Sequence, residues 1–123
     1  MDDRYQNRLR FSFAHEIGHF ILHKNIYENF NIKTFKDFYD FLTNNISQDQ
    51  YSYFETQANK FANHLLVPRE VLKEQREKEI EKQKDIPKNI SNKTLNSYLA
   101  IPLSKKFGVS EKVIEIALGE LEA

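Results

Sequence analysis

Apolar side chains recur at three- and four-residue spacing along most of this chain, and only three Gly and three Pro interrupt the pattern. Such spacing places apolar side chains on one face of an α-helix. Pro68 disfavours helical geometry in the residue before it, Gly108 suits a helix C-terminus, and Ser110 suits a helix N-cap. We therefore predict a mainly α fold with little or no β-sheet, with helices over about residues 3–23, 34–42, 54–67, 68–84, 93–107 and 111–121.

Two of the predicted helices carry an apolar stripe that we expect to pack in the core. The stripe of the first helix consists of Phe13, Ile17, Phe20 and Ile21. The stripe of the third consists of Phe54, Ala58, Phe61 and Leu65. Because His15 and His19 fall on a separate arc of the first helix, we expect both imidazoles to face a cleft.

The first helix contains the run His15-Glu16-Ile17-Gly18-His19. Residues four apart are neighbours on one helix face, so His15 and His19 can bind one metal ion. Glu16 is turned about 100° away and can reach a water on that ion. The alternative is a helix with two core histidines that are satisfied by hydrogen bonds.

A catalytic zinc site usually has three protein ligands, and the best third candidate is Glu55. Asn59 lies one turn further on and is predicted to orient a ligand histidine by a hydrogen bond. In the alternative interpretation, Glu55 is only an acidic residue in the first turn of a helix, where the helix dipole favours it.

The other two histidines are predicted to be surface or rim residues. On a continuous helix His23 lies about 12 Å along the axis from His15, at about 1.5 Å per residue. That distance is too long for the two to share an ion. His64 lies still further from Glu55, about 13.5 Å along its helix.

The composition limits the classes of function. With 123 residues, we expect one domain over 1–123. Eighteen basic residues balance eighteen acidic ones, so no net charge attracts nucleic acid or an anionic membrane. The chain has no Cys, which excludes thiolate zinc sites and thiol catalysis. We expect a cytoplasmic protein, because the N-terminus has no apolar signal segment and no long apolar run occurs.

The tail over 103–121 has the outline of a helix-turn-helix. Its second helix carries one Lys against four Glu residues, Glu111, Glu115, Glu120 and Glu122, which would repel phosphate. We therefore expect a helical hairpin that packs on the core, with direct nucleic-acid binding as the weaker alternative.

Two segments together resemble the ImmA/IrrE family of zinc metallopeptidases. They are Arg10-Phe11-Ser12-Phe13-Ala14-His15-Glu16-Ile17-Gly18-His19-Phe20-Ile21-Leu22-His23 and the pattern Glu55-x-x-Ala58-Asn59-x-Phe61-Ala62-x-x-Leu65-Leu66-x-Pro68. The resemblance implies a zincin-like core that binds zinc through His15, His19 and Glu55, with Glu16 as the catalytic base. It also implies a bacterial or phage protein that cleaves a helix-turn-helix repressor of a phage or mobile element.

The chain departs from the family in two places. Fourteen residues precede the first motif, whereas members usually have several dozen, so we expect the family's N-terminal strands to be missing. The aromatic-rich spacer over 24–54 would form a lid over the cleft or cover the core.

The expected mechanism is that of a metallopeptidase. Zinc would lower the pKa of a water towards neutrality, and Glu16 would take its proton and deliver it to the leaving amine. A second oxyanion donor is expected, and Tyr51, Tyr53 and Tyr27 are chemically suitable. Two alternatives are a non-catalytic repressor- or DNA-binding module on the same fold and a structural helical domain without metal.

Overall fold

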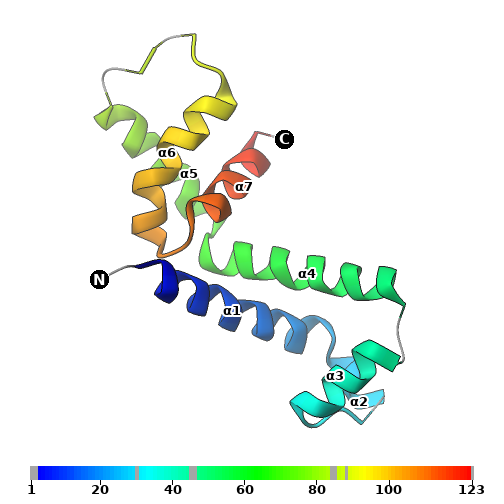
Figure 1. Cartoon of the computed structure of the whole chain (residues 1–123). Coiled ribbons are helices and arrows are strands. Elements are labelled where there is room, and N and C mark those ends of the chain that lie inside the picture. The colour runs from blue at the N-terminus through cyan, green and yellow to red at the C-terminus, as the bar shows by residue number, and fades with distance from the viewer. Residues whose placement is uncertain (1–2, 30, 45–46, 84–85, 88, 123) are drawn as a thin grey trace. The chain divides into compact units, whose positions relative to one another are not determined.

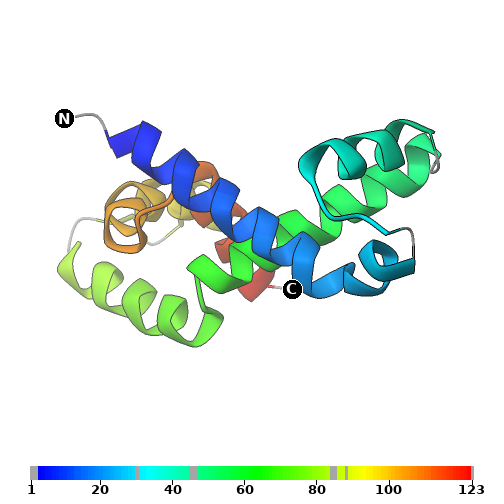
Figure 2. The same ribbon diagram turned by 90° about the horizontal axis from the view of Figure 1, so that it is seen from below.

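The computed structural model describes residues 3–29, 31–44, 47–83, 86–87 and 89–122, except the side chains of Asp3, Ile26, Tyr27 and Leu42. Within these ranges the chain forms seven helices and no strand (Figures 1 and 2), which confirms the prediction of a mainly α fold. The helices are α1 (Asp3–Leu22), α2 (Lys24–Asn29), α3 (Phe35–Asn44), α4 (Gln48–Leu66), α5 (Arg69–Lys82), α6 (Asn92–Phe107) and α7 (Glu111–Leu121).

The contacts divide the chain into two compact units. One unit contains residues 13–62, and the other contains residues 1–12 together with 63–123. None of the described helices is both long enough and apolar enough to cross a membrane. The single-domain organisation over 1–123 stays a prediction.

The unit that contains 63–123 has an apolar core. Helices α5, α6 and α7 pack against one another through buried aliphatic side chains. Burial of a Leu or Ile side chain stabilises a fold by roughly 1.5–3 kcal/mol. The largest fully buried side chains of this core are Leu72, Leu99, Leu103, Ile114 and Leu118, with Val67 and Val109 beside them.

The turn between α6 and α7 follows the predicted signals. Gly108 has φ 66° and ends α6 in the left-handed region, where a side chain would be strained. The hydroxyl of Ser110 accepts a hydrogen bond from the amide of Val113 at 3.2 Å and caps α7. Arg10 donates to the carbonyls of Phe107 and Gly108, which have no partner within the helix. Helices α6 and α7 are therefore joined by a short turn with a cap on each side.

In the unit 13–62, α1 buries a different face from the one predicted. Phe13 is 65% exposed and Phe20 is 59% exposed, whereas Ala14 and Gly18 are buried. The prediction that Phe13, Ile17, Phe20 and Ile21 pack in the core is wrong. The same prediction is also wrong for Leu65, which lies near the end of α4. The reason is close helix packing, since a Cβ on Gly18 would lie 3.0 Å from Phe61 Cδ1 and 3.2 Å from the Ala58 carbonyl oxygen.

Helix α4 begins earlier than predicted. The Ser47 hydroxyl accepts a hydrogen bond from the Gln50 amide, and the Gln50 side chain accepts one from the Ser47 amide, both at 3.2 Å. These reciprocal bonds form a capping box. Glu55 therefore lies in the interior of α4, and the acidic residue of its first turn is Asp49. The interpretation of Glu55 as a first-turn residue is wrong.

Candidate metal centre

The structure brings the three predicted ligands together within the unit 13–62. His15 and His19 lie on α1, and Glu55 lies on the neighbouring stretch of α4. His15 Nε2 lies 3.0 Å from Glu55 Oε2, and His19 Nε2 lies 2.9 Å from Glu55 Oε1. One ligand atom from each of the three residues falls within 4.8 Å of the other two. Both imidazoles thus face the same carboxylate.

The donor atoms have the burial and the chemistry that a metal ion requires. His19 is 2% exposed, the His15 side chain 17% and the Glu55 side chain 30%. His15 Nε2 is buried and has no hydrogen-bond partner, although Glu55 lies close to it. A buried polar atom without a partner is costly unless something else binds it. Two imidazole nitrogens and one carboxylate are a common ligand set for catalytic zinc, so these residues fit the ion.

The electrostatics favour the form of histidine that binds metals. Burial lowers the pKa of His19, and the nearby imidazoles of His15 and His23 lower it further. The hydrogen bond and the negative charge of Glu55 act in the opposite direction. Because the lowering dominates, the neutral imidazole is favoured, and only a neutral imidazole has a lone pair for a metal ion.

Glu16 lies beside this cluster at the solvent edge. Its side chain is 53% exposed, and its Oε1 lies 3.8 Å from His15 Nδ1, beyond hydrogen-bond range. Glu16 also borders a cavity of about 360 Å³. The other residues that line this cavity come from α1, α3 and the loop before α3, and they are Phe20, Ile32, Lys33, Thr34, Phe35 and Phe38.

The residues behind His19 are not the predicted Asn59 but His23 and Gln57. Asn59 is exposed, and no described contact links it to His15 or His19. His19 Nδ1 instead lies 3.1 Å from His23 Nδ1, and His23 Nε2 lies 2.9 Å from Gln57 Oε1. His23 is only 5% exposed, so its prediction as a surface or rim residue is wrong.

The spacing of His19 and His23 contained the signal for this arrangement. Residues four apart share a helix face, so a buried His19 brings His23 into the interior with it. The axial distance from His15 argues against His23 as a ligand of the same ion, but it does not exclude His23 as the partner of a ligand. Gln57, two residues after Glu55, gave no comparable signal.

The remaining candidate residues lie outside the cluster. His64 is exposed and pairs with Glu120 at 3.0 Å, as expected for a surface residue. Tyr51 and Tyr53 are both exposed, and no described contact places either at the two histidines. The side chain of Tyr27 lies outside the described residues.

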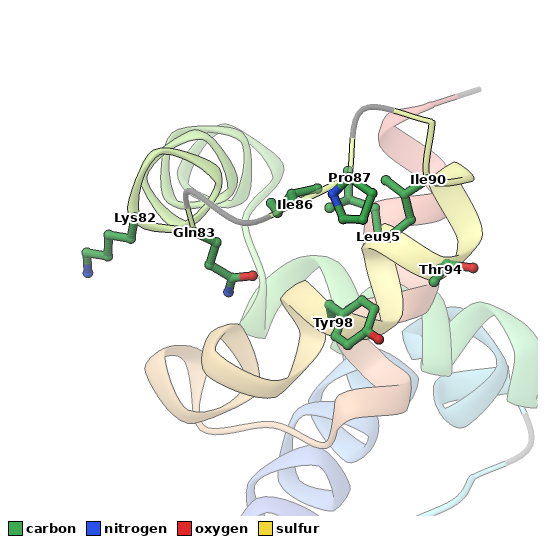
Figure 3. Close-up of a pocket in the computed structure, with 8 residues that line it drawn as sticks. All are labelled: Lys82, Gln83, Ile86, Pro87, Ile90, Thr94, Leu95 and Tyr98. Atoms are coloured by element: carbon green, nitrogen blue, oxygen red, sulfur yellow. The ribbon is translucent and has the colours of Figure 1, made fainter.

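A second cavity, of about 760 Å³, lies in the other unit, between the end of α5 and the start of α6. The described residues of its lining include no histidine and no carboxylate, and the Lys82 side chain extends away from the other side chains (Figure 3). The lining residues are Lys82, Gln83, Ile86, Pro87, Ile90, Thr94, Leu95 and Tyr98.

The chain matches the sequence profile of a known family. The sequence profile of a peptidase family, described as the IrrE N-terminal-like domain, matches residues 3–118. This range includes α1, which carries His15 and His19, and α4, which carries Glu55. Neither a curated protein sequence nor a solved structure matches the chain.

Proposed function

Because the chain belongs to the IrrE N-terminal-like domain family of peptidases, we propose that it is a zinc-dependent peptidase. The membership confirms the resemblance inferred from the two motifs, and it makes this a metallopeptidase-type domain. The observation that supports catalysis best is the convergence of His15, His19 and Glu55 to within 4.8 Å. Loop residues and termini do not contribute to this cluster, which lies entirely on two packed helices.

In this proposal, the Nε2 atoms of His15 and His19 and the carboxylate of Glu55 hold the ion. A zinc ion supplies Lewis acidity, which lowers the pKa of a water and polarises a carbonyl oxygen. The positions of the two imidazoles on successive turns of α1 fix two of the ligands relative to each other. Glu55 adds a negative charge that offsets part of the charge of the ion.

Glu16 acts as the base and then as the acid. It removes a proton from the water whose oxygen attacks the carbonyl carbon of the peptide, and it returns a proton to the amine nitrogen as the carbon–nitrogen bond breaks. The exposure of its side chain, at 53%, keeps the carboxylate accessible to substrate. No other described carboxylate lies as close to His15 apart from Glu55.

The cavity beside Glu16 indicates what the enzyme accepts next to the bond that it cleaves. Its apolar lining residues are Phe20, Ile32, Phe35 and Phe38, and Lys33 also lines it. A peptide placed for attack near Glu16 can insert one side chain into this cavity. We therefore expect a large apolar side chain adjacent to the scissile bond.

We propose a helix-turn-helix repressor of a phage or mobile element as the protein substrate. The support is the family resemblance of the two motifs. Direct nucleic-acid binding by α6 and α7 is not part of the proposal, because Glu111 and Glu115 give α7 an acidic surface and Glu120 is paired with Arg69.

The first experiment measures metal content and cleavage in the same preparations. Wild-type protein should contain one zinc per chain by elemental analysis, and His19→Ala should lose it because two ligands cannot hold the ion tightly. Glu16→Gln should keep the zinc but lose about 10²–10⁴-fold in the rate of cleavage of a repressor encoded beside this chain.

His64→Ala is the matched control, since His64 is an exposed histidine away from the cluster. It should retain both zinc and activity. Zinc stoichiometry that is unchanged in His19→Ala would refute the ligand assignment. Wild-type cleavage by Glu16→Gln would remove Glu16 from its catalytic role and favour a non-catalytic binding module.

A further inference from the structure

We propose that His23 and Gln57 form a positioning relay that holds the proton of His19 on Nδ1 and so presents His19 Nε2 to the metal. This inference rests on the proposed zinc site. It assigns a role to two residues that are neither ligands nor the base. The relay runs from Gln57 on α4, through His23 directly after the end of α1, to His19 on α1.

The relay consists of two contacts in series. Gln57 Oε1 lies 2.9 Å from His23 Nε2, and His23 Nδ1 lies 3.1 Å from His19 Nδ1. The opposite edge of the His19 ring carries Nε2, which lies 2.9 Å from Glu55 Oε1. Each histidine therefore uses both of its ring nitrogens.

Burial makes these contacts consequential. His19 is 2% exposed and His23 is 5% exposed, so bulk water is largely excluded as an alternative partner. Aromatic rings also restrict the two imidazoles, since Phe54 contacts His23 with ring centroids 4.6 Å apart and Phe38 contacts His19 at 5.6 Å. A buried hydrogen bond between fixed rings has few ways to rearrange.

The ring nitrogen that carries the proton in each histidine follows from Gln57 Oε1, the acceptor at the outer end of the relay. A carbonyl oxygen can only accept, so Gln57 Oε1 requires a hydrogen on His23 Nε2. A neutral imidazole carries one such hydrogen, which leaves a lone pair on His23 Nδ1. His19 Nδ1 must then be the donor across the 3.1 Å contact, and His19 Nε2 is left with its lone pair.

With this order, a cation must lie between His19 Nε2 and Glu55, because their lone pairs would otherwise repel each other. A lone pair on His19 Nε2 faces a carboxylate oxygen at 2.9 Å, an arrangement that a shared cation stabilises. The opposite proton order would place a hydrogen on Nε2, where it would block the ion. The relay therefore favours the tautomer of His19 that binds metal, which is the usual role of a partner behind a ligand histidine.

The test measures zinc affinity and the positions of the ring protons in full-length protein. His23→Phe keeps a ring beside Phe54 but cannot accept a hydrogen bond, and it should weaken zinc binding about 10–100-fold in competition with a chelating dye. His23→Gln offers an oxygen acceptor and should recover part of the loss. Gln57→Leu should weaken binding less, because it removes only the outer contact.

Thr56→Ala serves as the control, because Thr56 is exposed on the same helix. It should bind zinc as the wild type does. Nitrogen-15 spectra of the zinc-loaded wild type should show His19 protonated on Nδ1 and His23 protonated on Nε2. A purely structural role for His23 would not determine these positions.

Two results would overturn the relay while the zinc site stands. One is a folded His23→Phe and a folded Gln57→Leu that both bind zinc within about twofold of wild type. The other is zinc-loaded protein with the His23 proton on Nδ1. If His19→Ala still lost its zinc while these variants kept theirs, the peptidase proposal would stand. A wild type that binds no zinc would overturn both.

Discussion

The two compact units of this protein bury different kinds of side chain. In the unit that contains 63–123, the largest buried side chains are Leu, Ile and Val, and helix caps complete the backbone hydrogen bonds at the turn. In the unit 13–62, small residues and imidazoles lie on the buried face of α1. The Phe and Ile side chains of this part of α1 are exposed. Burial of apolar area stabilises the first unit, which also buries the polar side chains of Asn63, Glu79, Asn96 and Ser104. In the unit 13–62 the buried polar side chains are the imidazoles of His19 and His23, which need partners.

The candidate metal centre and the aliphatic core thus lie in different units of the chain. Buried polar atoms are costly unless they are bonded, and His15 Nε2 has no hydrogen-bond partner. A ligand that binds such atoms in the folded state adds its binding free energy to stability. The unit 13–62 should therefore depend on the metal, and the other unit should not.

Removal of zinc should have the largest effect and should be confined to one unit. At free zinc about a thousand times its dissociation constant, the ion contributes about 4 kcal/mol. A chelator should accelerate hydrogen exchange of α1 and α4 amides within 13–62 and leave those of α6 and α7 unchanged. Equal acceleration of exchange in both units would contradict the claim that the metal stabilises only the unit 13–62.

Leu99→Ala should instead destabilise the unit that contains 63–123. Leu99 is fully buried in the apolar core, so truncation should cost about 2–5 kcal/mol through lost burial and a cavity. Urea unfolding followed by circular dichroism measures this loss. The variant should still bind one zinc under native conditions, and loss of the metal would show that the two units are coupled.

Substitution of two helical glycines tests how tightly the unit 13–62 is packed. A Cβ on Gly18 would lie 3.0 Å from Phe61 Cδ1, whereas nothing lies within 4 Å of one on Gly119. Gly18→Ala should cost roughly 1–3 kcal/mol through overpacking, while Gly119→Ala should gain up to about 1 kcal/mol from helix propensity. Thermal unfolding of both variants decides whether the close approach of α1 and α4 is required.

The smallest expected effect concerns acid stability of the other unit. Glu79 is buried and accepts a hydrogen bond from Lys106 Nζ at 2.8 Å, and this bond holds the pKa of its carboxyl below the usual value despite burial. The ionised pair therefore stabilises the fold at neutral pH, and its contribution disappears as the pH falls below the ordinary range of a Glu carboxyl, through the lowered pKa.

Glu79→Gln should cost about 1 kcal/mol at pH 7 and show a shallower loss of stability between pH 5 and about pH 3 than wild type. Denaturant unfolding across this pH range measures both. Glu74→Gln is the matched control, because Glu74 lies on the same helix and pairs only with Lys78 at the exposed surface. Identical acid profiles for wild type and Glu79→Gln would contradict the assignment.

Helix content and the three candidate ligands could be predicted from the sequence because both depend on local order. Spacing of three and four residues predicts helices, and the motif around His15 specifies which side chains share a helix face. Gly108 and Ser110 act within their own turn, so their roles were predictable too. The beginning of α4 was missed, although Ser47 and Gln50 had the pattern of a capping box.

Only the tertiary structure decided which face of α1 is buried and what surrounds His19. A helical wheel separates polar from apolar sides, but close packing on α4 selects the side with Ala14 and Gly18, since small side chains let the backbones approach. That choice carries His23 into the interior, brings Gln57 to it and leaves Asn59 exposed. Side-chain chemistry is local and can be read in the sequence, whereas partners on another helix exist only once the helices pack.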